Sequence, residues 1–156
     1  MCSSDLPIVE TKSKGVVNQN PTEKGLKDYY KNYFPIGVAV SPKLLEDNLS
    51  ADLIRHQFNS LTAENAMKMG PIHPEENRYN WEPADKIVDF AQKNGFLLRG
   101  HNLCWHNQTP KWFFTEGDSV GNIPPKKVTK EVLLARLKQH ITDVVTRYKG
   151  DRKSVV

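Results

Sequence analysis

The sequence is poor in cysteine and has no long apolar runs. The first shortage argues against a disulfide-stabilised protein, and the second argues against a membrane-spanning one. Its 156 residues include only two cysteines, Cys2 and Cys104, which are too few and too far apart for a disulfide framework. The longest apolar runs, 35–40 and 96–98, fall far short of the ~20 residues that a membrane span needs. The first residues lack the apolar core of a signal peptide. We therefore expect no transmembrane segment, no signal peptide in this chain and no membrane partner.

The sequence also lacks concentrated charge of one sign. Its 22 lysines and arginines are scattered among 18 aspartates and glutamates, and the net charge is +4. No basic block is longer than the stretch 125–127. Such a distribution is typical of a solvated surface rather than of a nucleic-acid-binding stripe, so no nucleic-acid partner is expected.

The two ends of the chain differ in pattern from the residues between them. The codons GAT CGG AAG AGC GTC GTG would encode residues 151–156, and TGC TCT TCC GAT CT would encode Cys-Ser-Ser-Asp-Leu within residues 1–6. Both strings resemble common sequencing adapters, so we interpret these segments as non-native tails. The alternatives are a lipoprotein-like start with a serine linker and a frayed C-terminus. Residues 7–24 are polar and turn-rich and are predicted to be a lead-in, which leaves 25–150 as the folded domain.

Between the tails, short extended segments alternate with amphipathic helices. The predicted strands span residues 35–40, 59–65 and 96–105, and the predicted helical segments span 25–34, 50–58, 81–95 and a long stretch that begins at Thr129. The run 35–40 is apolar throughout, as expected of a strand buried on both faces. Ser50 is the predicted N-cap of its helix. Strand–helix order repeated three times predicts parallel βα units, in either a doubly wound sheet or a barrel.

Two of these helices have a clear apolar stripe. In the segment 81–95 the stripe consists of Ala84, Ile87, Val88 and Ala91, and Gly95 supplies a left-handed stop. In the long helix it is expected to consist of Leu133, Leu137, His140, Ile141, Val144 and Val145. Both helices are therefore predicted to pack one face against a sheet.

Two polar clusters, 62–68 and 101–108, follow the second and third predicted strands. The carboxyl ends of parallel strands lie at one edge of the sheet, so the clusters should converge there. Carboxylate, amide, ammonium and imidazole groups can bind vicinal hydroxyls, and Trp105 offers a flat apolar face to a sugar ring. No glycine-rich phosphate loop is present. The spacing predicts an α/β ligand site without naming the ligand.

His101, Cys104 and His106 raise the alternative of a metal site. Strand alternation would place His101 and Trp105 on one face and the other two on the opposite face, which prevents three ligands from converging. We therefore expect no metal and no cofactor, and interpret Cys104 as a small buried residue. Met67 and Met69 are expected to fill the core, and Trp81 and Trp112 to pack between helices and loops.

Taken together, these segments resemble glycoside hydrolase family 10 over roughly residues 26–150. The two main motifs are Phe58–Lys68 and Arg99–Trp112, and the resemblance extends, in the family's order and spacing, through Asn77–Trp81, His140–Ile141 and Tyr148–Gly150. The resemblance implies an α/β fold, an incomplete (β/α)₈ TIM barrel holding about the first three βα units. A whole barrel of this type needs ~250 residues. The implied activity is that of a retaining endo-1,4-β-xylanase, which hydrolyses internal bonds of xylan.

The resemblance also implies roles for single residues. The xylose unit one subsite back from the cleaved sugar would be bound by Glu64, Asn65 and Gln108. The sugar at the cleavage point would be held by Lys68, His101 and Trp105, and His106 would support this group of residues. In the family, both catalytic glutamates follow later strands, beyond Gly150. Retaining hydrolysis needs two carboxyl groups about 5–5.5 Å apart. This chain alone is therefore expected to hold no catalytic residue and to be inactive.

Two other functions remain open from the residues. One is a non-catalytic carbohydrate-binding module derived from the same fold, although an end just before an expected strand favours a fragment. The other is mixed xylanase and cellulase activity. The resemblance further implies secretion to the extracellular or periplasmic space, xylan or xylo-oligosaccharides as partners, and a monomer at full length.

Overall fold

The computed structural model describes residues 23–117, 125–149 and 154–155. The predicted tail 1–6, most of the predicted lead-in 7–24, and residues 151–153 and 156 of the predicted C-terminal tail lie outside the described residues. In the part that is described, no helix combines the length and apolar character needed to cross a membrane.

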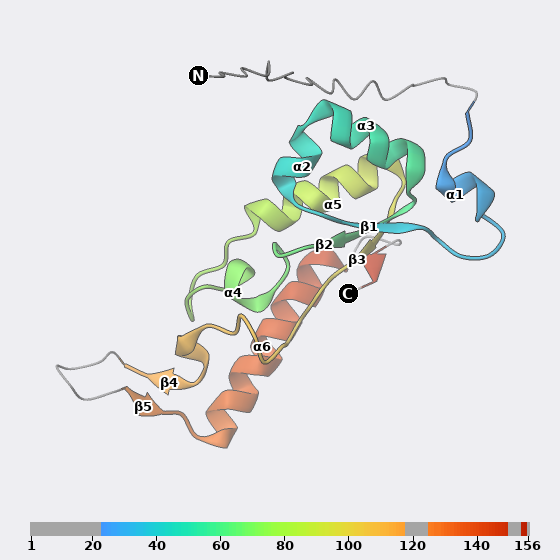
Figure 1. Cartoon of the computed structure of the whole chain (residues 1–156). Helices are drawn as coiled ribbons and strands as arrows, with labels where there is room; N and C mark the ends of the chain where they lie inside the picture. Colours follow the sequence, from blue (N-terminus) through green and yellow to red (C-terminus); the bar gives the residue numbers. More distant parts are fainter. Residues whose placement is uncertain (1–22, 118–124, 150–153, 156) are drawn as a thin grey trace, which may run out of the picture.

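The elements alternate between strands and helices along the chain (Figure 1). The helices are α1 (Leu26–Tyr29), α2 (Pro42–Glu46), α3 (Asn48–Gln57), α4 (Met69–Ile72), α5 (Glu82–Asn94) and α6 (Lys130–Tyr148), with a 3₁₀ turn η1 (Lys111–Phe113). The strands are β1 (Gly37–Val40), β2 (Ser60–Ala63), β3 (Leu97–Arg99), β4 (Thr115–Glu116), β5 (Lys126–Lys127) and β6 (Ser154–Val155). Strands β1, β2, β3 and β6 form one parallel sheet in that order, and β4 pairs antiparallel with β5. The predicted parallel βα units are confirmed.

The parallel sheet is covered by helices on one face. Its buried side chains Val40, Leu61, Ala63 and Leu98 join a core that includes Ile54 of α3, Ile87 of α5 and Val144 of α6. Figure 1 shows α2, α3 and α5 together on one side of these strands. The residues of the opposite face are Gly37, Ala39, Ser60, Thr62, Leu97 and Arg99, all exposed or half-buried. The prediction that 35–40 is buried on both faces was therefore wrong, because no described element covers the second face.

Helix α5 agrees closely with the predicted segment 81–95. All four residues of the predicted stripe are buried, and the helix ends where Gly95 adopts φ 72°, in the left-handed region. The backbone N–H of Gly95 donates to the carbonyl of Gln92 and so closes the last turn. The apolar stripe at helical spacing and the glycine that ends it were sufficient to predict this helix, because both signals lie within the segment itself.

Helix α3 begins one turn earlier than predicted. Asp47, not Ser50, is its N-cap, and the Asp47 carboxylate accepts a hydrogen bond of 2.9 Å from the backbone N–H of Ser50. Both residue types favour the N-cap position, and the sequence contains both of them three residues apart. The helix that starts from Asp47 buries Ala51 and Ile54.

The apolar stripe of α6 was only partly predicted. His140, Val144 and Tyr148 are buried, whereas Val145 is 37% exposed and Leu133, Leu137 and Ile141 are half-buried. The C-terminal half of α6 packs beside the strands, and its N-terminal half extends past the sheet towards β4 and β5 (Figure 1). The N-terminal half therefore finds fewer apolar neighbours than a full-length stripe would need.

Strand β3 is much shorter than the predicted segment 96–105. It ends at Arg99, because its ladder with β2 comprises only the pairs of Ser60, Leu61 and Thr62. On its other edge, Leu98 pairs with Ser154 of β6, within the tail interpreted as non-native. Parallel pairing uses backbone groups, so it makes no demand on the identity of the paired side chains.

Candidate functional site

The first polar cluster begins where β1 and β2 end. The backbone N–H of Glu64 donates to the carbonyl of Val40 at 3.0 Å, which fixes Glu64 at the carboxyl ends of both strands. Asn65 follows, and a turn closes through a bond of 2.9 Å from the backbone N–H of Lys68 to the Asn65 carbonyl. The side chains of Glu64 and Asn65 are exposed and that of Lys68 is half-buried. The cluster thus presents a carboxylate, an amide and an ammonium group at one end of the sheet.

The two polar clusters meet at Lys68. Its Nζ donates to Asn65 Oδ1 at 2.8 Å and lies 5.2 Å from the centre of the Trp105 ring system. An ammonium over an aromatic face is attracted by the ring electrons. The ammonium, the amide and the indole therefore form one group, although Asn65 and Trp105 are 40 positions apart in the chain. The predicted convergence is present here.

A second link joins the clusters through the backbone. The N–H of Gly70, in α4, donates to the Gln108 carbonyl at 2.8 Å. A Cβ atom at Gly70 would lie 2.6 Å from that same oxygen, so the close approach requires glycine. Gln108 has φ 58°, in the left-handed region, and its side chain is exposed. This contact holds Gln108 beside the turn that carries Lys68.

The residues from His101 onward lie on a loop rather than on a strand. Strand alternation therefore does not orient them, and the argument that placed His101 and Trp105 on one face was wrong in its premise. Cys104 is exposed on this loop, which corrects the prediction that it is buried. Trp105 is half-buried, contacts the exposed His106 edge-to-face at 5.4 Å, and accepts a bond of 2.5 Å from Thr109 Oγ1 through its carbonyl. His101 is half-buried just beyond β3.

Among the described residues, no three histidine, cysteine, aspartate or glutamate side chains gather as metal ligands. The packing predictions agree with the structure, in which the two methionines are buried and the two tryptophans are half-buried. Met67 and Met69 are buried, Trp81 packs against the core, and the Trp112 indole N–H donates to the carbonyl of His73 at 3.2 Å.

A buried histidine pair beside the site was not singled out from the sequence. His73 and His140 are both almost fully buried, with their Nδ1 atoms 3.1 Å apart. His73 Nε2 lies 3.0 Å from the Glu76 carbonyl, which only accepts, so His73 Nε2 is the protonated nitrogen. His140 Nδ1 must then donate to His73 Nδ1, and His140 Nε2 is left without a hydrogen-bond partner in the described structure. Both rings are therefore assigned as neutral.

Aromatic rings continue outward from this pair. His73 stacks on Tyr79 at 3.8 Å, and Tyr79 stacks on Trp81 at 4.4 Å. The Tyr79 hydroxyl donates to Asp143 of α6 at 2.6 Å. Burial, followed by this hydrogen bond, raises the pKa of Tyr79 well above its usual range. The column therefore ties α6 to the segment between α4 and α5.

The histidine pair predicts that stability falls in acid. Burial, followed by repulsion between the two rings when both are protonated, lowers the pKa of His140 from 6.5 to about 4, although the Leu103 carbonyl and Asp143 favour the protonated ring and so oppose the shift. Burial also lowers the pKa of His73. The unfolded chain therefore binds more protons than the folded chain between these values, so stability is full above pH 6.5 and falls as the pH drops towards 4. His140 alone should cost up to roughly 3 kcal/mol of unfolding free energy.

Urea denaturation of the protein from pH 7.5 to pH 4 measures this dependence. His140→Gln keeps an N–H that can donate to His73 but cannot titrate, so the variant should lose less stability than the wild type over this range. An equally steep loss in the variant would assign the acid sensitivity to other groups.

Comparison with known proteins gives one consistent relationship. The model of glycosyl hydrolase family 10 matches residues 25–155. The endo-1,4-beta-xylanase/feruloyl esterase of Xylanibacter ruminicola is 50% identical over 125 residues, which are 80% of this chain and 16% of that protein. The beta-1,4-xylanase of Dictyoglomus thermophilum is also 50% identical over 125 residues, covering 80% of this chain and 32% of that protein.

Solved structures agree with the sequence relatives. A mutant protein in complex with xylotriose is 44% identical, with a TM-score of 0.75 over 82% of this chain and 37% of that chain. A psychrophilic glycoside hydrolase family 10 endo-beta-1,4-xylanase is 43% identical, with a TM-score of 0.75 and the same two coverages. The chain therefore spans about a third or less of the length of these proteins and has the fold of part of a TIM barrel.

Proposed function

The chain belongs to glycosyl hydrolase family 10, and we propose that it forms the first part of the barrel of a retaining endo-1,4-β-xylanase, called the parent enzyme below. The observation that supports this most directly is the meeting of Lys68 with Asn65 and Trp105 at the carboxyl ends of the strands. Ligands of parallel α/β barrels bind at that end. A cation, an amide and an aromatic face suit a ring that carries several hydroxyl groups.

We assign the exposed and half-buried polar residues to two neighbouring sugar positions. The xylose unit one subsite back from the cleaved sugar is bound by Glu64, Asn65 and Gln108. The sugar at the cleavage point is bound by Lys68, His101 and Trp105. His106 supports Trp105. The Gly70–Gln108 contact supports this grouping, because it holds Gln108 next to the turn of Asn65 and Lys68. In this arrangement Lys68 lies at the border between the two positions.

Hydrolysis needs two further groups. A retaining glycosidase uses one carboxylic acid to protonate the leaving oxygen and a carboxylate about 5–5.5 Å away to attack the anomeric carbon. We propose that the part of the parent enzyme following residue 150 supplies both glutamates. The segment 25–150 then supplies substrate binding and no catalytic residue.

Xylan or xylo-oligosaccharides are the proposed substrates, and one structural neighbour, solved with xylotriose, supports this class of ligand. From the family to which the chain belongs, we propose that the parent enzyme is secreted and acts as a monomer.

Recovery of the genomic DNA that flanks this segment tests the proposal. The reading frame should continue after Gly150 with a hydrophobic strand that ends in Asn-Glu, and the codons of the two adapter-like tails should be missing. The expressed parent enzyme should cleave xylan internally and release sugars with retained anomeric configuration, as followed by proton NMR. A stop codon or an unrelated domain directly after Gly150, or inversion at the anomeric carbon, would refute it.

A further inference from the structure

The proposed sugar-binding residues of the second cluster lie on a loop that has little regular structure of its own. The loop runs from Gly100 to the start of α6, and its described elements are η1, β4 and β5. A loop of this kind makes few backbone hydrogen bonds within itself, so its polar groups need partners elsewhere. Its position therefore depends on side chains from neighbouring elements.

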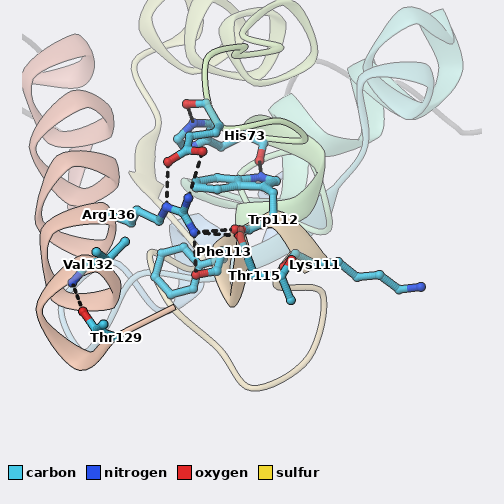
Figure 2. Close-up of polar contacts among 9 residues, drawn as sticks. His73, Lys111, Trp112, Phe113, Thr115, Thr129, Val132 and Arg136 are labelled. Atoms are coloured by element: carbon cyan, nitrogen blue, oxygen red, sulfur yellow. Dashed lines mark hydrogen bonds and ion pairs between the residues drawn. The ribbon is translucent and has the colours of Figure 1, made fainter. Parts of the chain in front are cut away.

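Arg136 of α6 supplies three of those partners. Its Nη1 donates to the carbonyl oxygens of Trp112 at 2.7 Å, Thr115 at 3.1 Å and Phe113 at 3.4 Å. Figure 2 shows the guanidinium directed from α6 into the turn formed by these residues. The Arg136 side chain is only 11% exposed, unusually little for an arginine. It is thus a built-in part of the turn rather than a surface charge.

The other nitrogens of Arg136 bind Glu76, in the segment between α4 and α5. Nε donates to Oε1 at 2.6 Å and Nη2 donates to Oε2 at 2.9 Å, which is a bidentate pair. The guanidinium also lies 5.5 Å from the ring of Trp112, whose indole N–H donates to the His73 carbonyl. Arg136 therefore connects α6, the turn η1 and the residues after α4.

The anchored turn lies close in sequence to the proposed sugar-binding residues. Trp112 follows Gln108 by four positions, and within this interval Thr109 Oγ1 bonds back to the carbonyl of Trp105. At the other end, Gln108 is fixed by the N–H of Gly70. The stretch from Trp105 to Trp112 is thus held at two points, Gly70 and Arg136.

We propose that Arg136 is a positioning residue that sets the place of Trp105 and Gln108 by holding the turn after them. The sugar-binding part of this statement rests on the proposed function. Lysine cannot replace arginine here, because one ammonium group cannot bind both Glu76 oxygens in a fork and also reach three carbonyls. The change Arg136→Lys therefore keeps the charge and removes the anchor.

Arg147 provides a matched control on the same helix. It forms a bidentate pair with Asp85 of α5, and its guanidinium lies 4.8 Å from the ring of Trp81. It therefore shares the ion pair and the aromatic contact with Arg136, but its pair partner and aromatic partner lie outside the loop. Arg147→Lys reports what the loss of such an arginine does to α6 in general.

The test compares Arg136→Lys, Arg147→Lys and the wild type in the parent enzyme. Arg136→Lys should raise KM for xylotetraose roughly 10- to 100-fold, since charged hydrogen bonds contribute about 1.5–3 kcal/mol. Hydrogen exchange followed by mass spectrometry should speed up over residues 101–116. Arg147→Lys should change exchange in α5 and α6 and leave KM within about twofold. All measurements are made at a fixed interval below the Tm of each variant.

Every outcome of this comparison either supports or contradicts the proposed role of Arg136. Unchanged KM and exchange in Arg136→Lys, or equal changes in both variants, would overturn the proposal. If Arg136→Lys does not fold, Glu76→Gln weakens the same anchor and should raise loop exchange and KM less strongly, and no change in it would equally overturn the proposal. If the parent enzyme does not cleave xylan, the proposed function fails, but exchange over 101–116 still decides whether Arg136 holds the loop.

Discussion

The purified chain of 156 residues should release no reducing sugar from xylan above the buffer blank. Enzymes accelerate such reactions by a factor of about 10⁶ or more, and a positioned general acid alone contributes roughly 10²–10⁴-fold. Both catalytic glutamates of the family are expected in the part that follows residue 150. A single carboxylate such as Glu64 cannot both protonate the leaving oxygen and attack the anomeric carbon. The expected loss relative to the parent enzyme is therefore complete within the limits of the assay.

The measurement is a reducing-sugar assay over several hours, with the parent enzyme as positive control and heat-treated chain as the blank. Heat-labile release of sugar by the chain would contradict the prediction. In that case Glu64→Gln would show whether the carboxylate at the end of β2 takes part, because the substitution removes its acidity and keeps its shape.

Replacement of Lys68 by alanine in the parent enzyme should lower kcat/KM for xylan by roughly 10²–10³-fold. Charged hydrogen bonds contribute about 1.5–3 kcal/mol each, and more where they tighten in the transition state. The change removes the ammonium and also releases its two neighbours, the amide of Asn65 and the ring of Trp105. Steady-state kinetics with soluble xylan measure the effect.

Lys93→Ala is the matched control. Lys93 lies near the end of α5, its side chain is 76% exposed, and its ammonium is 4.0 Å from Asp89 on the same helix. It should keep kcat/KM within about twofold, because exposed ion pairs contribute little. If kcat/KM fell by a similar factor in the two variants, and circular dichroism showed both to be folded, the assignment of Lys68 to the substrate site would be contradicted.

The sequence predicted the elements whose signals are local. Helix α5 has its stripe, its length and its glycine stop within one continuous segment, and all of them agree with the structure. The length of β3 could not be predicted in this way, because it depends on how far the strand stays paired with a neighbour distant in sequence. The run 96–105 alternates well, but its ladder with β2 stops at the pair of Thr62 and Arg99, so the strand ends there. The residues that follow Arg99, Cys104 among them, therefore lie on a loop and are as exposed as loop residues usually are.

The candidate site was likewise predictable only where the signals are local or follow from the order of the elements. Convergence of the clusters 62–68 and 101–108 follows from parallel topology, which the order of strands and helices predicts. The contacts that fix their geometry join residues far apart in sequence, such as Gly70 with Gln108 and Arg136 with Glu76. Nothing local marks Arg136, because an arginine on an amphipathic helix is usually solvated. Only the tertiary structure distinguishes it from Lys93.

The uncovered face of the parallel sheet has a consequence for synthesis on the ribosome. At about 5–20 residues per second, the remaining hundred or so residues of a barrel of ~250 would emerge roughly 5–20 s after residue 150. During that interval the nascent first part of the parent enzyme would display this face, on which, among the described residues of β1, β2 and β3, Leu97 is the one large aliphatic side chain, 41% exposed, beside small and polar ones such as Ala39, Thr62 and Arg99. A face of this composition offers little apolar surface for chaperones or neighbouring nascent chains to bind, so we expect few such contacts on this face before the later strands close the barrel.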